Sequence, residues 1–302
     1  WHPAAAERPL PVRMTLAAAL SAATGRRAAA RPEQPVGGGS INECWRWPSR
    51  EGPLFVKLAH GDRLWMFEAE AAGLDELGRA VALRVPRVLG HGAAAGQAFL
   101  ALEWIDFGSA SSRSETSLGE GLAAQHRVTA TEFGWHRGNT IGSTPQHNDP
   151  DRDWIRFFVE RRLRYQLDLA ARNGHAGRLT ERGALLCERT SAFFDSYRPV
   201  PSLLHGDLWG GNWSADASGR PVIFDPAVYF GDREADLAMT RLFGGFGAAF
   251  YSAYESAWPL EPGAAERTTL YNLYHVLNHL NLFGGGYLSQ AQAMIDRLLA
   301  AS

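Results

Sequence analysis

The sequence predicts an α+β fold of two lobes, in which a small antiparallel β-sheet with one helix precedes a larger, mainly helical lobe. Strand-length apolar runs, separated by Gly and Pro turn signals, fill the first hundred residues. Helical periodicity dominates the remainder, interrupted by a short pair of extended runs within residues 201–225. We therefore expect residues 14–103 to form the N-terminal lobe and residues 104–302 the C-terminal lobe.

Composition supports a packed globular protein and excludes several functional classes. The 302 residues are 45% hydrophobic and 21% charged, close to the averages of globular proteins. With 30 basic and 32 acidic residues, the chain has no global positive field, so we expect neither nucleic acid nor a membrane surface as partner. Two cysteines, Cys44 and Cys187, are too few for a disulfide framework. We expect a cytoplasmic protein that is a monomer, with a weak dimer as the alternative.

The N-terminal lobe begins after residues 1–13, which precede the first methionine, Met14, and which we interpret as an extension outside the fold. An alanine-rich stretch at 15–23 is too short to cross a membrane and predicts an amphipathic helix. Turn signals and apolar spacing then predict the other elements of this lobe in chain order. These are a strand near Val36, strands at 41–47 and 54–58, a helix at 64–79, an extended segment at 85–88 and a strand at 99–102.

The C-terminal lobe begins with a serine-rich loop at 108–117 that we expect to join the two lobes. Apolar spacing predicts six helices, at 118–129, 154–172, 180–196, 236–243, 246–258 and 267–283. A polar run at 134–153 predicts a long loop, and two extended runs flank a turn at 216–219. The glycines at 244–247 predict a break between helices.

The strongest functional motif is His205-Gly206-Asp207, followed by Asn212 and by Asp225 at the end of the next apolar run. In phosphoryl-transfer sites one carboxylate faces the attacking hydroxyl, while an amide and a second carboxylate hold Mg²⁺. The tripeptide alone could be an ordinary turn with an Asp side-chain cap. The spaced Asn212 and the strand-terminal Asp225 favour a catalytic site instead.

A second candidate group lies in the N-terminal lobe. Lys57 ends an apolar strand, and Glu70 in the next predicted helix could pair with it and position it on nucleotide phosphates. Glu68 is the alternative partner, although the small residues after Glu70 favour Glu70. A lysine at a strand end is otherwise most often a solvated surface residue.

The glycine-rich turn between the first two predicted strands is a further candidate for phosphate binding. Its residues are Gly37, Gly38, Gly39 and Ser40. Glycines let backbone N–H groups approach phosphates closely, but the turn lacks the following residues of a P-loop or of a dinucleotide-binding fingerprint. Without Lys57 downstream, a flexible turn would explain it equally well.

Together these residues resemble the fructosamine kinase (ketosamine 3-kinase) family, within the protein-kinase-like and aminoglycoside phosphotransferase fold. The most family-specific segments are 139–146 and 207–212, and the similarity spans about residues 14–300. Further segments agree at 36–42, 66–70, 133–136, 225–227, 233–239, 243–246 and 277–281. One departure is Ser40, where many family members have a cysteine, so the resemblance does not extend to redox control through that position.

The resemblance implies an ATP- and Mg²⁺-dependent kinase with its nucleotide-binding lobe at 14–103 and its catalytic and substrate lobe at 104–302. It implies Asp207 as catalytic base, Asn212 and Asp225 as Mg²⁺ ligands, and Asp236 as a buried brace of the catalytic loop. The residues implied to bind nucleotide are Gly37, Gly38, Gly39, Ser40, Lys57, Glu70, Glu103, Trp104 and Ile105. Candidates for contact with the acceptor are Trp209, Asn278 and His279.

The acceptor implied by the resemblance is the 3-hydroxyl of a ketosamine, a sugar joined to an amine or a protein lysine by glycation. A phosphate there leaves by elimination, which promotes deglycation and protein repair. Two alternatives remain at this stage. One is a small-molecule kinase of the same fold acting on an aminoglycoside, a choline-like amine or a free sugar, and the other is a noncatalytic ATP-binding regulator.

Overall fold

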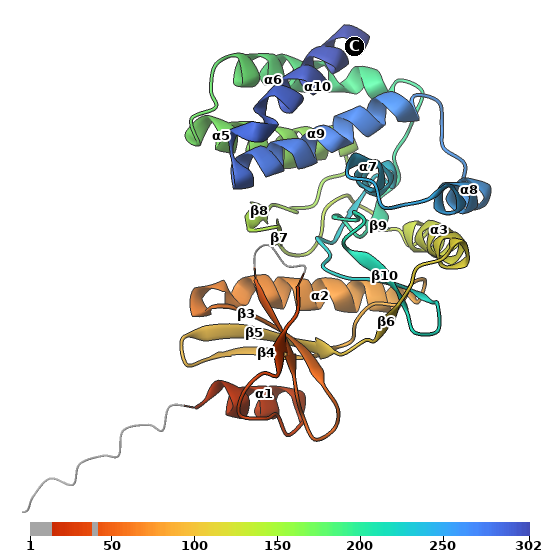
Figure 1. Ribbon diagram of the computed structural model, residues 1–302. Helices are drawn as coiled ribbons and strands as arrows, with labels where there is room; N and C mark the ends of the chain where they lie inside the picture. Colours follow the sequence, from red (N-terminus) through yellow and green to blue (C-terminus); the bar gives the residue numbers. More distant parts are fainter. Residues whose placement is uncertain (1–13, 38–41) are drawn as a thin grey trace, which may run out of the picture. The chain divides into compact units, whose positions relative to one another are not determined.

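The computed structural model describes residues 14–37 and 42–302 (Figure 1). They form two compact units. The first contains the described residues up to Glu68 together with Val88–Trp104, and the second contains Ala69–Arg87 and Ile105–Ser302. The single boundary expected after residue 103 differs from this division, because Leu77 and Leu83 of the Ala69–Arg87 stretch pack into the hydrophobic core of the second unit.

The first unit is built on an antiparallel sheet of five strands in the order β1-β2-β3-β5-β4. Its elements are α1 (Leu16–Thr24), β1 (Gln34–Pro35), β2 (Glu43–Trp47), β3 (Leu54–His60), the 3₁₀ turn η1 (Gly61–Arg63), the start of α2 (Leu64–Ala80), β4 (Val88–Ala94) and β5 (Gln97–Glu103). Every second residue of β3, from Leu54 to Leu58, packs with Leu20 of α1 in one apolar cluster. Lys57 therefore belongs to the opposite face of the sheet.

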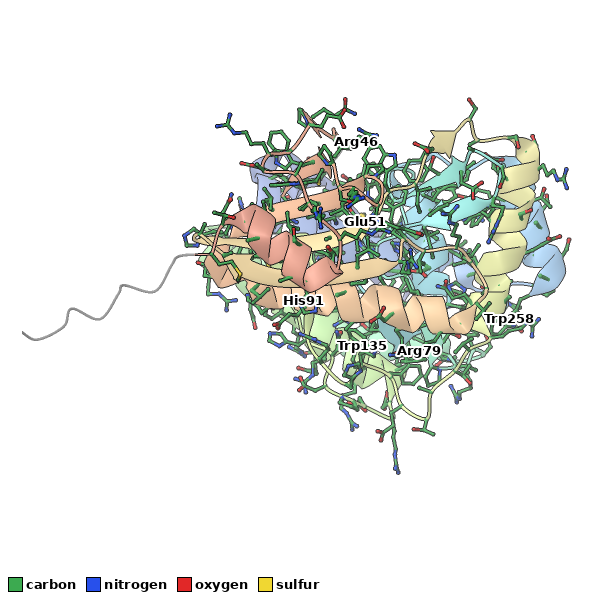
Figure 2. The ribbon with its side chains drawn as sticks, turned by 90° about the horizontal axis from the view of Figure 1, so that it is seen from below. Arg46, Glu51, Arg79, His91, Trp135 and Trp258 are labelled. Atoms are coloured by element: carbon green, nitrogen blue, oxygen red, sulfur yellow. The ribbon has the colours of Figure 1, made fainter. Side chains whose placement is uncertain are left out.

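Strand β4 is absent from the sequence-based prediction, and its glycines explain why. The strand lies beside α1 (Figure 1). At Gly90 a Cβ atom would lie 2.5 Å from the carbonyl oxygen of Ala23 at the end of α1. His91, labelled in Figure 2, follows in the same strand. The close approach of α1 requires a glycine at a position where an apolar side chain would have indicated a strand. The alternation of apolar and polar residues that predicts a strand is therefore missing from this segment.

The second unit is mainly helical, as predicted. Its helices after α2 are α3 (Ser112–His126), α4 (Trp154–Phe158), α5 (Tyr165–Arg172), α6 (Arg178–Arg189), α7 (Glu234–Leu242), α8 (Ala248–Ala257), α9 (Ala264–Phe283) and α10 (Leu288–Ala301). The π-helical turn η2 (Val159–Arg164) joins α4 to α5, and the 3₁₀ turns η3 (Thr190–Phe194) and η4 (Gly285–Tyr287) follow α6 and α9. Helix α10 packs against α6 and α9 (Figure 1).

Short strands of the second unit position its loops. They form the sheet β11-β10-β6 and the pairs β12-β9 and β7-β8. Their bounds are β6 (Phe107–Gly108), β7 (Asn139–Ile141), β8 (Thr144–Gln146), β9 (Ser202–Leu204), β10 (Trp213–Asp216), β11 (Pro221–Ile223) and β12 (Tyr229–Gly231). The turn predicted at 216–219 joins β10 to β11, and the predicted glycine break separates α7 from α8.

Two expectations for this unit were wrong, and two of its elements were not predicted. Helix α3 begins within the loop expected at 108–117, because Ser111 caps it by accepting a hydrogen bond from the backbone N–H of Ser114. The loop expected at 134–153 contains the β7–β8 hairpin. Helix α10 and strand β12 were not predicted at all.

Among residues 14–37 and 42–302, no helix combines the length and apolar character needed to span a bilayer.

Candidate active site

The three residues of the predicted phosphoryl-transfer motif follow or precede short strands of the second unit. Asp207 lies three residues beyond β9, Asn212 directly precedes β10, and Asp225 lies two residues beyond β11. The backbone N–H of Phe224 donates to the carbonyl oxygen of Asn212 at 3.0 Å. This bond holds the end of the catalytic loop (residues 205–212) against the segment that carries Asp225.

Asn212 connects the two aspartates. Its side-chain Nδ2 donates to the backbone oxygen of Asp207 at 2.8 Å and to the Asp207 carboxylate oxygen Oδ2 at 3.3 Å. The same nitrogen lies 3.5 Å from the backbone oxygen of Asp225. The fold thus brings together residues separated by five and eighteen positions in the sequence.

These residues suit a hard divalent cation. All hydrogen bonds that the structure shows for the Asn212 side chain are made by Nδ2, which leaves the amide oxygen for a ligand. Carboxylate and amide oxygens are the donors that Mg²⁺ takes, with phosphate oxygens completing its shell. In the described part of the chain, no group of three or more His, Cys, Asp or Glu side chains could hold a metal by itself.

Charge and burial tune the carboxylate of Asp207. Burial, together with the negative charges of Asp225 and Asp236, raises the pKa of Asp207 to about 7, against the opposing hydrogen bond from Asn212. A carboxylate with such a pKa is a competent proton acceptor near neutral pH. Asp225 itself has a positive φ of 57°, an uncommon conformation for a residue other than glycine.

The neighbouring histidine has a structural role in the loop. The backbone N–H of Asp207 donates to Nδ1 of His205 at 3.2 Å, and His205 Nε2 lies 3.0 Å from the carbonyl oxygen of Phe224. Nδ1 is therefore unprotonated, and Nε2 carries the hydrogen and donates it. Burial lowers the pKa of His205, which agrees with a neutral ring. The ring thus ties Asp207 to the residue preceding Asp225.

Asp236 on α7 holds the backbone of the catalytic loop. Its carboxylate accepts hydrogen bonds from the N–H groups of His205, at 2.7 Å, and Gly206, at 2.8 Å. The side chain is 1% exposed. The backbone N–H groups of the two residues that precede Asp207 are thereby satisfied by one buried carboxylate.

His126 of α3 supports this brace and was missed in the sequence. Its Nε2 lies 3.1 Å from Oδ2 of Asp236, and its Nδ1 lies 2.8 Å from the hydroxyl of Tyr254 on α8. Burial alone would raise the pKa of Asp236, but the hydrogen bond and charge of His126 lower it below its ordinary value. His126 is 110 residues from Asp236 in the chain, so no local spacing could reveal the pair.

Gly206 is required by a close backbone contact. Its φ is +84°, and a Cβ atom there would lie 2.0 Å from the carbonyl oxygen of Ala227. The N–H of Ala227 in turn donates to the carbonyl oxygen of His205 at 2.8 Å. The residue before Asp207 is thus in direct contact with the second residue after Asp225.

We expect Gly206→Ala to cost about 1–3 kcal/mol more stability than Gly219→Ala, because the new methyl group meets the Ala227 carbonyl. Gly219 is a matched control, since its φ of +83° imposes the same backbone strain but its Cβ would have no neighbour within 4 Å. Urea unfolding of the two variants measures the difference. Equal losses in both would mean that the Ala227 contact relaxes freely.

The predicted nucleotide-binding residues lie partly in the first unit. Lys57 occupies the middle of β3, between Cys44 of β2 and Leu100 of β5, and is 4% exposed. Gly37 follows β1, whereas Gly38, Gly39 and Ser40 lie outside the described residues. Glu68 and Glu70, the two candidate partners of Lys57, are both half-buried on α2.

The candidate adenine-binding segment follows the last central strand of the first unit. Glu103 ends β5 opposite Leu54 of β3. The guanidinium of Arg46, labelled in Figure 2, lies over the ring of Trp104 with its carbon 5.3 Å from the ring centre. Ile105 is the first residue of the following stretch of the second unit and is buried.

The three candidate acceptor residues differ in accessibility. Trp209 is 38% exposed, and its ring lies so close to Gly211 that a Cβ there would meet it at 2.2 Å. His279 is half-buried, with its ring packed against Phe243, Phe283 and Tyr287. Asn278 is only 2% exposed, and its amide bonds to Gln166 and to the carbonyl of Ile141, so the fold itself occupies it.

Comparison of the sequence with known proteins identifies close relatives over nearly the whole chain. The family model of fructosamine kinase matches residues 12–301. A Synechocystis protein named as a ketoamine kinase is 46% identical over 94% of this chain and 96% of its own length. The chloroplastic protein-ribulosamine 3-kinase of Arabidopsis thaliana is 42% identical over 87% of this chain and 81% of its own length.

Solved structures agree with the sequence relatives. A Thermobifida fusca crystal structure assigned to fructosamine-3-kinase has a TM-score of 0.84 at 32% identity, covering 95% of this chain and 99% of that one. Its counterpart from Haemophilus somnus also has a TM-score of 0.84, at 29% identity, covering 94% and 97% of the two chains. Aminoglycoside phosphotransferase APH(4)-Ia, at 15% identity and a TM-score of 0.61 over 89% of this chain and 93% of that one, shares the fold alone.

Proposed function

Because this chain belongs to the fructosamine kinase family, we propose that Asp207, Asn212 and Asp225 transfer the γ-phosphoryl group of ATP to the 3-hydroxyl of a ketosamine. The chain is a phosphotransferase that acts on a hydroxyl group of ketosamines, and its family implies ATP as phosphoryl donor. The observation that carries the assignment of residues is the Asn212 side chain, which joins the segments of both aspartates.

Within this proposal Asp207 performs the proton transfer. Its carboxylate orients the acceptor hydroxyl and takes its proton as the oxygen attacks the γ-phosphorus in line. Asn212 and Asp225 would hold Mg²⁺, which when bound with the nucleotide neutralises charge on the phosphate oxygens. Asp236, through the N–H groups of His205 and Gly206, keeps the loop in place during the transfer.

The remaining nucleotide contacts in our proposal are assigned to Lys57, Glu103 and Trp104 of the first unit and to Glu70 and Ile105 of the second. Lys57, paired with Glu70, would contact the phosphates, and the glycine-rich turn from Gly37 to Ser40 would cover them. The backbone from Glu103 to Ile105 would bind adenine. These roles come from the family resemblance of the matching segments.

The product explains the biological use of the reaction. Carbon 3 of a ketosamine is bonded directly to the carbonyl carbon 2, and carbon 1, which carries the amine, lies on the other side of the carbonyl. Loss of a proton from carbon 1 forms an enol whose electrons expel inorganic phosphate from carbon 3, and hydrolysis of the unsaturated product releases the amine. Phosphorylation would thereby remove the sugar from an amine or a protein lysine, which is a repair of glycation.

Purified protein incubated with Mg·ATP and either fructosyl-lysine or ribulosyl-lysine tests the function. We expect acceptor-dependent ADP release and a new sugar 3-phosphate signal in ³¹P NMR, both lost in Asp207→Asn. Transfer only to aminoglycosides, choline or free sugars would replace the acceptor class. Nucleotide binding without transfer to any acceptor would instead indicate a regulator.

A further inference from the structure

Two buried amide side chains of the β7–β8 hairpin contact the segment that follows Asp225. Asn139 and Gln146 are direct partners in the register of the hairpin and are 5% and 2% exposed. Asn139 Nδ2 donates to the carbonyl oxygen of Val228 at 2.8 Å, and Gln146 Nε2 donates to that of Ala227 at 3.1 Å. Neither residue was assigned a role from the sequence, although both lie in a family-specific segment.

The orientation of each amide is determined by its neighbours, beginning at a buried arginine. Arg162 in the turn η2 can only donate, and it donates to Oδ1 of Asn148 at 2.7 Å. Asn148 Nδ2 then donates to Oδ1 of Asn139 at 2.9 Å, and Gln146 Nε2 donates to the same oxygen at 2.8 Å. Tyr274 closes the network by donating to Oε1 of Gln146 at 2.7 Å. Each amide nitrogen must therefore face the acceptor that it meets.

The Ala227 peptide is the point at which this network reaches the catalytic loop. Its carbonyl oxygen accepts from Gln146 and lies against Gly206, while its N–H donates to His205. Ala227 is two residues after Asp225, and Gly206 directly precedes Asp207. The backbone of this one residue, held by Gln146, thus touches the segments of the proposed base and of a proposed metal ligand.

We propose that Gln146, oriented by Asn139 and Tyr274, is a positioning residue that sets the separation of Asp207 and Asp225 through the backbone of Ala227. The kinetic part of this inference depends on the function proposed above, whereas the structural part does not. A displacement of about 1 Å between reacting groups can reduce turnover roughly 100-fold. Gln146 touches neither substrate nor nucleotide in this assignment, so its effect is exerted through the backbone.

The test compares Gln146→Leu with Thr190→Val. Thr190 is the control because it is also a fully buried polar side chain that is replaced by an apolar one of similar size, but its hydroxyl donates to the carbonyl oxygen of Leu186 in α6, outside the network. Hydrogen exchange of residues 203–212 and 224–231 in nucleotide-free protein reports on the positions of the two segments. Turnover with Mg·ATP and a ketosamine is measured in parallel.

We expect exchange in both segments to be at least about 10-fold faster in Gln146→Leu, and kcat to fall roughly 10- to 100-fold with KM for the acceptor within about two-fold. Thr190→Val should change neither by more than about two-fold. Tyr274→Phe, which removes the bond to Oε1 of Gln146, should show the same pattern at smaller amplitude and serves if Gln146→Leu does not fold.

Unchanged exchange in Gln146→Leu, or an equal increase in Thr190→Val, would overturn the proposal, as would a loss of turnover without faster exchange. If the wild-type protein phosphorylates no ketosamine, the proposed function fails. The exchange comparison then still decides whether Gln146 positions the two segments.

Discussion

Asp207→Asn is expected to abolish turnover and yet to make the folded protein more stable above neutral pH. The carboxylate is the proposed proton acceptor, and loss of a general base reduces kcat roughly 10²–10⁴-fold. Its ionised form is disfavoured in the folded state, since burial and the charges of Asp225 and Asp236 raise the pKa of Asp207 to about 7. The amide of asparagine carries no charge, so the variant avoids the free-energy cost of burying an ionised side chain at this position. Such a gain in stability is common when a strained catalytic group is replaced.

The sign of the pH dependence follows from the raised pKa. Between the ordinary value of 3.8 and about 7, the unfolded chain ionises Asp207 while the folded chain retains the proton, so wild-type stability declines relative to the variant. Above pH 7 the difference is constant. We expect the melting temperature of Asp207→Asn to exceed that of the wild type by about 2–4 °C at pH 8 and by progressively less toward pH 5.

Thermal unfolding of nucleotide-free protein from pH 5 to pH 8 measures this difference. Asp168→Asn on the exposed face of α5 makes the same change of charge and is the control. A pH-independent difference, or a variant less stable than the wild type at pH 8, would contradict the raised pKa. Retained turnover would contradict the role of Asp207 as base.

Asp236→Ala is expected to cost the largest amount of stability, about 3–5 kcal/mol, because it leaves buried donors without their charged partner. Three donors converge on this carboxylate, from the N–H groups of His205 and Gly206 and from Nε2 of His126. Loss of the brace should also lower turnover, since these N–H groups directly precede Asp207. Urea unfolding and kcat measured on the folded fraction give the two quantities.

Asp236→Asn tests whether stability depends on the charge and hydrogen bonds of the carboxylate or only on the volume of the side chain. An amide presents one oxygen and one NH₂ group to three donors, so we expect it to be nearly as destabilising as alanine despite its size. Because the pKa of Asp236 is lowered in the folded protein, the loss should persist from pH 8 down to about 5 and shrink only as the carboxylate protonates in more acidic solution. An asparagine variant within about 1 kcal/mol of the wild type would show that the brace does not depend on three converging donors.

Elements with strong periodicity were predictable from the sequence. The helices that became α2, α7 and α9 and the strands β3 and β5 have apolar residues at spacings that belong to one type of structure. Strands β4 and β12 and the β7–β8 hairpin lack such spacing. The position of β4 depends on a glycine contact with α1, that of β12 on pairing with β9, and that of the hairpin on its amide bonds to Ala227 and Val228.

The sequence by itself determined the fold class, the order of the main elements and the motif of Asp207, Asn212 and Asp225, because these depend on periodicity and on spacings of a few residues. Only the tertiary structure decided what supports that motif. His126 and Tyr254 behind Asp236, and Gln146 against the Ala227 peptide, meet their partners from 81 to 128 residues away. Buried polar groups must find partners wherever the chain brings them, and a linear pattern does not record that proximity.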